Sequence, residues 1–146
     1  MKKILFLITV CFAFISCGMN VKSETSSASQ EEITVKDHVE VLYFHGKQRC
    51  ATCMAIESNT KAAVETSFAE QIKNGDVVFR IIDITKEENE KIAEKYEVTW
   101  SSLFVVKYKN GKETSENMTE FAFGNARKSP DVFKDGVVKT VNEMLK

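Results

Sequence analysis

Two cysteines, Cys50 and Cys53, lie at the point where the spacing of apolar residues changes along the chain. Before them, residues 38–45 are rich in β-branched and aromatic side chains, which predicts a strand. After them, apolar side chains recur at helical spacing up to Asn74 and Gly75, a pair typical of the C-terminal end of a helix. The sequence therefore places the cysteine pair where a strand passes into a helix, with Cys50 at the start of that helix.

The spacing of apolar residues continues to alternate beyond this first unit. Residues 77–84 are almost continuously apolar, which predicts a strand buried on both faces. Residues 86–96 are highly charged with a few apolar positions at helical spacing, and residues 103–108 return to a strand pattern. This order of elements predicts a sheet with a parallel core and helices packed on it.

The last third of the chain predicts a hairpin followed by a helix. Asn110 and Gly111 form a strong turn signal, and we expect residues 113–121 to return as the partner strand. Ser129 and Pro130 are typical of the first positions of a helix. We therefore expect an α/β fold with a central mixed sheet, parallel core strands, an antiparallel C-terminal hairpin and helices on both faces.

A signal peptide is predicted over residues 1–16. Lys2 and Lys3 are followed by an apolar run, residues 4–15, in which only one residue is polar. Residues 14–17 read Phe-Ile-Ser-Cys and resemble a bacterial lipoprotein processing site, which implies that Cys17 carries a lipid. An ordinary secretory signal with an incidental cysteine is the alternative.

Residues 17–36 are rich in serine and glutamate and contain no aromatic residue, which predicts a lipidated, flexible tether. The globular domain is then expected over residues 37–146, on a membrane-anchored lipoprotein that faces the periplasm or the cell exterior. The predicted processing leaves Cys50 and Cys53 as the domain's pair of thiols, because Cys11 leaves with the signal peptide and Cys17 is acylated. Outside the reducing cytosol, a disulfide between such a pair can persist.

The charge of the chain argues against a nucleic-acid partner. Lysine and arginine number 20 against 21 aspartate and glutamate residues, and the formal net charge is −1. Binding to DNA or RNA usually needs a basic face, which this balance does not supply. We expect no cofactor and no nucleic acid among the partners.

The region from Val35 to Lys146 resembles thioredoxin. The resemblance rests on the strand before the Cys-Ala-Thr-Cys motif, and on four further segments: Asp83, residues 95–98, residues 104–106 and residues 109–112. It implies a thioredoxin fold in which Cys50 is the nucleophile, Cys53 is the resolving cysteine, and the two form a redox-active disulfide.

Several residues depart from the thioredoxin pattern. Arg49 stands where the family usually has a tryptophan, and Phe44 stands where it has a buried aspartate that accepts a proton. Ser102 takes the place of the family's cis-proline, so we expect the peptide bond before it to be trans. Trp100 is a candidate to cap the site in place of the missing tryptophan, with ordinary packing as the alternative.

The thiol of Cys50 is expected to be activated by its surroundings. A helix N-terminus stabilises an anion by about 0.3–1 kcal/mol, which is less than one pKa unit at about 1.36 kcal/mol per unit. Arg49 directly precedes Cys50, and we expect its charge to stabilise the thiolate further.

These features predict an exported thiol–disulfide oxidoreductase that exchanges its disulfide with protein thiols or disulfides, in a direction that the sequence leaves open. The resemblance to tethered thioredoxins implies a membrane thiol protein as an electron-transfer partner. Two alternatives stay open: a passive structural disulfide, and a binding module whose two sulfurs hold a soft metal or a metalloid. A structural zinc site is not expected, because His38 and His45 lie near opposite ends of one predicted strand.

Overall fold

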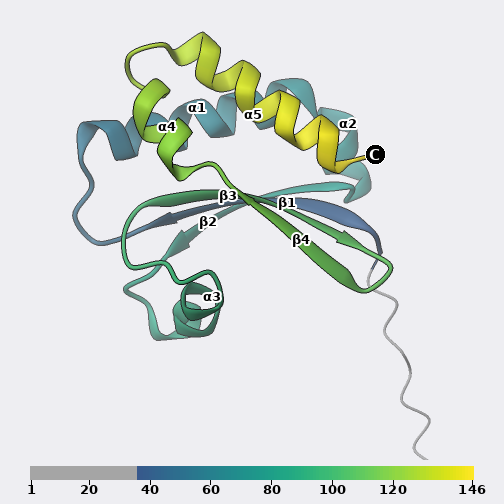
Figure 1. Ribbon diagram of the computed structural model, residues 1–146, viewed down its shortest axis with the longest axis horizontal. Coiled ribbons are helices and arrows are strands. Elements are labelled where there is room, and N and C mark those ends of the chain that lie inside the picture. The colour runs from purple at the N-terminus through teal and green to yellow at the C-terminus, as the bar shows by residue number, and fades with distance from the viewer. Residues whose placement is uncertain (1–35) are drawn as a thin grey trace, which may run out of the picture. The chain divides into compact units, whose positions relative to one another are not determined.

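The computed structural model describes residues 36–146, drawn in colour in Figure 1. In chain order the elements are β1 (His38–His45), α1 (Ala51–Ser67), α2 (Ala69–Asn74), β2 (Val77–Asp83), the 3-10 helix η1 (Glu87–Asn89), α3 (Glu90–Lys95), β3 (Ser102–Lys109), β4 (Lys112–Asn117), α4 (Thr119–Asn125) and α5 (Pro130–Met144). Within this range no helix is long and apolar enough to cross a membrane. The predicted signal peptide and Cys17 lie outside the described residues.

The four strands form one mixed sheet in the order β2-β1-β3-β4. Strand β1 pairs with β2 in parallel and with β3 in antiparallel, and β3 pairs with β4 in antiparallel. Helices α1, α2, α4 and α5 cover one face of the sheet, and α3 lies on the other (Figure 1). The α/β fold with a mixed sheet, a C-terminal hairpin and helices on both faces is therefore confirmed.

Alternating side chains of β1 divide the core into two clusters. Val39, Val41 and Tyr43 belong to the larger cluster, which also contains buried residues of α1 and α5. Leu42 and Phe44 point to the opposite face and belong to the smaller cluster. This division follows from the two-residue repeat of a strand, and it decides which β1 side chains can reach the cysteine helix.

Two predictions about the strands are wrong. Strand β2 is not buried on both faces, because it lies at one edge of the described sheet and Ile81 is 45% exposed. The partner strand of the hairpin does not reach Phe121: β4 ends at Asn117, and Phe121 lies on helix α4. The Asn110–Gly111 turn predicted a partner strand but not its length; Met118, the N-cap residue of α4, and Ala122 within that helix are both buried, and the Ala122 N–H donates a hydrogen bond to the Met118 carbonyl.

The helix ends agree with the sequence signals at two places. Gly75 follows α2 in the left-handed conformation, with φ of 75°, which confirms the predicted end at Asn74 and Gly75. Pro130 is the first residue of α5, as expected. The single helix predicted after the cysteines is interrupted at Phe68, whose buried side chain separates α1 from α2.

Candidate functional site

The cysteine pair forms a disulfide at the N-terminus of α1. Cys50 is the N-cap residue of the helix, and its Sγ accepts a hydrogen bond from the backbone N–H of Cys53 at 3.1 Å. The two Cα atoms are 5.0 Å apart. Cys50 is exposed, whereas Cys53 is 7% exposed, so the two sulfurs differ in their access to solvent.

The disulfide opens onto a cleft of about 580 Å³. The cleft is lined by the segment before α1, by the loop that leads into β3 and by α4; these residues are Gly46, Gln48, Arg49, Cys50, Cys53, Thr99, Trp100, Ser101 and Phe123. Most of this lining is neutral.

Trp100 lines the same cleft as the disulfide, and its role as a cap on the site stays a prediction. The residue is 59% exposed, and its ring stacks on that of Phe123 with the ring centroids 5.2 Å apart. The stack therefore presents an apolar aromatic surface at the edge of the cleft.

The loop before β3 brings Ser101, rather than Ser102, to the cleft. Ser102 pairs with Phe44 in the sheet register, and its Oγ donates a hydrogen bond to the Trp100 carbonyl at 3.2 Å. Peptide bonds throughout residues 36–146 are trans, including the bond between Ser101 and Ser102. Ser101 thus contributes a small, largely buried residue to the lining of the cleft.

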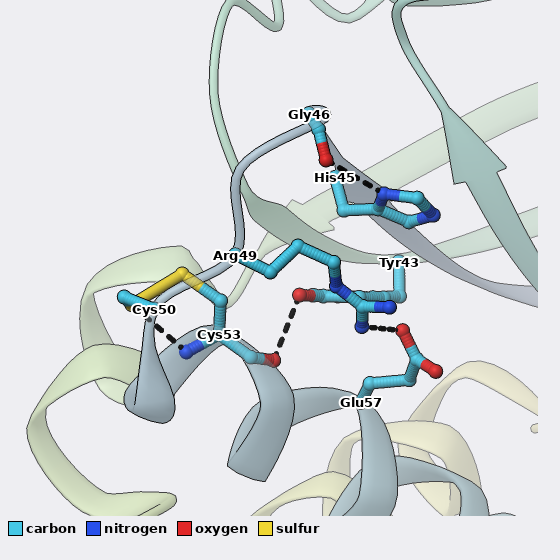
Figure 2. The surroundings of a disulfide bond; sticks show 7 residues. All are labelled: Tyr43, His45, Gly46, Arg49, Cys50, Cys53 and Glu57. Carbon is cyan, nitrogen blue, oxygen red and sulfur yellow. Dashed lines mark hydrogen bonds and ion pairs between the residues drawn. A yellow bond between two sulfur atoms is a disulfide. The ribbon is translucent and has the colours of Figure 1, made fainter.

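Tyr43 is a site residue that the sequence did not single out. Its hydroxyl donates a hydrogen bond to the Cys53 carbonyl at 2.8 Å, and its side chain is fully buried (Figure 2). Burial raises the pKa of Tyr43, against the lowering effect of Ser101 and Arg49. The neutral hydroxyl therefore stays available to join the end of β1 to the first turn of α1.

Phe44 does not face the cysteines. Its ring lies in the smaller core cluster with Tyr96 and Phe104, on the opposite face of the sheet from α1. The strand position that faces the cysteine helix is the neighbouring residue, Tyr43. One signal could have found it: the two-residue repeat of a strand gives Tyr43 the same side-chain direction as Val39 and Val41, which pack in the same core cluster.

Arg49 forms an ion pair with Glu57, on the second turn of α1 (Figure 2). Its guanidinium carbon lies 5.8 Å from the centre of the Tyr43 ring. The chain reaches this arrangement because Arg49 directly precedes the N-cap residue, while Glu57 is four residues after Cys53 and lies on the same helix face. Glu57 was not predicted as a site residue.

Metal ligands are few around the disulfide. Residues 36–146 contain no group of three or more histidine, cysteine, aspartate or glutamate side chains placed to hold a metal ion. A soft ion at this site would therefore be held by the sulfurs of Cys50 and Cys53, with no third ligand of those types from the described range.

Comparison with known proteins supports the fold. No protein-family model matches the chain, and no curated protein does. Among solved structures, human ERp44 in its zinc-bound form matches with a TM-score of 0.50 and 14% identity, covering 74% of this chain and 27% of that one. A structure described as that of a malarial protein covers 71% of this chain and 97% of its own, with 18% identity and a TM-score of 0.42.

ERp44 is a thioredoxin-family protein, and the present chain spans about a quarter of its length. At this level of identity the match speaks for the fold. The described residues thus form a thioredoxin-like α/β domain with a disulfide at the start of its first helix.

Proposed function

We propose that this protein is an exported thiol–disulfide oxidoreductase of the thioredoxin-like family. The observation that carries the proposal is the asymmetry of the disulfide: Cys50 is exposed in the cleft, whereas Cys53 is 7% exposed, one helical turn further on. Such an arrangement suits a pair in which one sulfur meets the client and the other completes the exchange.

The exchange balances as a two-electron reaction. In the reduced protein, the Cys50 thiolate attacks one sulfur of a client disulfide, forms a mixed disulfide and releases the first client thiolate. The Cys53 thiolate then attacks the Cys50 sulfur, forms the intramolecular disulfide and releases the second client thiolate. The client gains two electrons and, after protonation, two thiols; run backwards, the same steps oxidise a client dithiol.

The exported location belongs to the same proposal. The apolar run at residues 4–15 and the segment that ends at Cys17 support secretion followed by lipidation. A lipid anchor at Cys17 keeps the protein at a membrane facing the periplasm or the cell exterior, with client thiols and a membrane thiol electron donor as its partners.

Trapping of mixed disulfides tests the assigned roles. Replacing Cys53 by serine removes the resolving thiol and keeps the side chain small and polar, so clients should accumulate covalently on Cys50. The measurement is the amount of high-molecular-weight, reductant-sensitive species on non-reducing gels, with the Cys50→Ser variant as the matched control. We expect the Cys53→Ser variant to trap several times more client than Cys50→Ser; equal trapping would overturn the roles.

A binding role for the two sulfurs gives a different result in the same experiment. If neither variant traps a client, while the reduced wild-type protein binds copper(I) or arsenite tightly with loss of free thiols, the protein is a soft-ion carrier and the oxidoreductase proposal is wrong.

A further inference from the structure

The ion pair between Arg49 and Glu57 lies beside the disulfide and is partly shielded from solvent. Their side chains are 27% and 24% exposed. The Arg49 Nε is buried and has no hydrogen-bond partner among the described residues. The guanidinium is thus held between one carboxylate and the face of the Tyr43 ring (Figure 2).

The remaining surroundings of the cysteines contribute no second charge to the cleft. Arg49 is its only charged lining residue within residues 36–146; the loop before β3 and helix α4 contribute neutral side chains. Other ionisable groups nearby on β1 and the following loop do not line the cleft: Tyr43 is buried below it, the His45 ring bonds to the Gly46 carbonyl, and Lys47 is exposed. The electrostatic field at the sulfurs therefore depends on how far Arg49 is neutralised.

We propose that Glu57 is a positioning residue that sets the acidity of the Cys50 thiol, and with it the reduction potential of the disulfide, by holding the Arg49 charge in a neutral pair. The inference rests on the proposed oxidoreductase function, which it deepens: it assigns to Glu57, a residue outside the cleft lining, control over how strongly the protein oxidises or reduces its clients.

The sign of each effect follows from the charge that remains. Without the Glu57 carboxylate, the Arg49 cation is unbalanced and favours a thiolate, which stabilises the reduced protein and makes the disulfide more oxidising. Without the Arg49 guanidinium, the Glu57 carboxylate is unbalanced, and it disfavours the thiolate. Glu57 lies seven residues after Cys50, an axial rise of about 10 Å, which is close to the Debye length of about 8–10 Å at 0.1–0.15 M salt. Because the Arg49–Glu57 pair is partly shielded from solvent, salt screens it less than it screens exposed charges.

The experiment measures two quantities on Glu57→Gln, Arg49→Met and the double variant. One is the Cys50 pKa, obtained from the pH dependence of alkylation of the reduced protein. The other is the equilibrium constant at pH 8 for protein disulfide plus two glutathione thiols giving protein dithiol plus glutathione disulfide. Glu65→Gln is the matched control, because Glu65 pairs with Lys61 on the surface of the same helix, and an axial rise of about 22 Å separates it from Cys50.

We expect Glu57→Gln to lower the Cys50 pKa and to raise this equilibrium constant by about three- to tenfold, which is about 14–30 mV for a two-electron couple. Arg49→Met should shift both quantities the opposite way, the double variant should lie between the two, and Glu65→Gln should shift neither. Arg49→Lys, which keeps the charge, should stay closer to the wild type than Arg49→Met does.

Opposite shifts separate this role from a purely structural one. If both single variants shifted the Cys50 pKa in the same direction, the ion pair would act only by stabilising the structure at the start of the helix, and the inference would be wrong. An equal shift in Glu65→Gln would show that total charge, rather than Glu57, is responsible. If the wild-type disulfide did not exchange with glutathione at all, the proposed function itself would fail, a result distinct from the other two.

Discussion

Tyr43 joins the strand before the cysteines to the helix that carries them. Its hydroxyl reaches the Cys53 carbonyl, and its ring lies under the Arg49 guanidinium. Cys53 is also part of the helical hydrogen-bond ladder of α1, so the hydroxyl adds a second donor to a carbonyl that already has a helical one. The side chain therefore strengthens a geometry that the helix itself provides.

Replacing Tyr43 by phenylalanine tests this contribution at the residue scale. The ring and its packing remain, and one hydrogen bond is lost, so we expect the free energy of unfolding to fall by about 0.5–1.5 kcal/mol. Urea unfolding of the oxidised protein provides the measurement. The slope of the free energy of unfolding against urea concentration, the m value, should stay unchanged if both proteins unfold in two states. An unchanged midpoint would show that the hydroxyl does not contribute to stability.

The sequence predicted the position of Cys50 but not the directions of the side chains on the strand before it. The position of Cys50 at a helix start was predictable, because the strand signal, the cysteine spacing and the helical repeat are all local. The direction of Tyr43 and Phe44 was not, because the length of the segment between β1 and α1 decides which strand residue lies under the helix. A shift of one residue moves a side chain to the other face of a sheet, and the thioredoxin pattern drew attention to Phe44.

A small polar cluster connects the C-terminal end of helix α3 to the hairpin of β3 and β4. Glu113 of β4 accepts a hydrogen bond from the Tyr96 hydroxyl at 2.9 Å and forms an ion pair with Lys95. Burial acts to raise the pKa of Glu113, but Lys95 and Tyr96 outweigh it and hold that pKa below its ordinary value. The hydrogen bond to Glu113 raises the pKa of Lys95. The cluster links elements that the sheet register alone does not join.

The pH dependence of stability follows from these two shifts. A lowered folded-state pKa means that the Glu113 contribution is complete above the unfolded pKa of about 4.3 and is lost as pH falls through the folded value. A raised folded-state pKa means that the Lys95 contribution is complete below about pH 10.4 and is lost as pH rises through the folded value.

Glu113→Gln should therefore lower the free energy of unfolding mainly between about pH 5 and 10, by about 1 kcal/mol or less, because half of the Lys95 side chain is exposed. The difference from the wild type should shrink at pH 3. Thermal unfolding at several pH values measures it, with Glu116→Gln on the same strand as the matched control. A difference that stayed constant from pH 3 to pH 7 would contradict the ionic origin.

At the level of elements, the sequence failed where packing partners decide the outcome. Helix α4 has 7 residues, which is too few to show a clear helical repeat. Phe121 and Phe123 are two residues apart, the spacing of side chains on one face of a strand. Likewise, an apolar run such as β2 does not reveal whether a further strand covers its outer edge. Both elements are defined by contacts with distant parts of the chain.

At the scale of the whole molecule, the alternating order of strands and helices was sufficient to predict the α/β class. The connections between strands and helices are short, and the sheet is the one large layer against which the helices can bury their apolar faces. These two conditions leave few ways to arrange the elements around one core. The predictions for the chain before residue 36 rest on sequence alone.

Anchoring through Cys17 is tested by the Cys17→Ser variant of the full-length chain. Removing the sulfur proposed to carry the lipid should move the protein from the membrane fraction to the soluble fraction. The signal segment is predicted to be cleaved, so the lipid would be the remaining attachment to the membrane. Fractionation followed by immunoblotting measures the distribution, and Cys11→Ser is the matched control, since Cys11 lies inside the predicted signal peptide. Unchanged membrane association of Cys17→Ser would contradict lipidation.

Strand β4 has a further consequence for neighbouring copies on a membrane, where the proposed lipid anchor would place them. All six of its residues are exposed and polar, and they include Lys112, Glu113 and Glu116. An open sheet edge can recruit a strand from a neighbouring copy, which is a route to aggregation, and charged side chains along the edge oppose such pairing. Crowded copies would therefore resist joining their sheets edge to edge through β4, and each disulfide cleft would remain free for exchange.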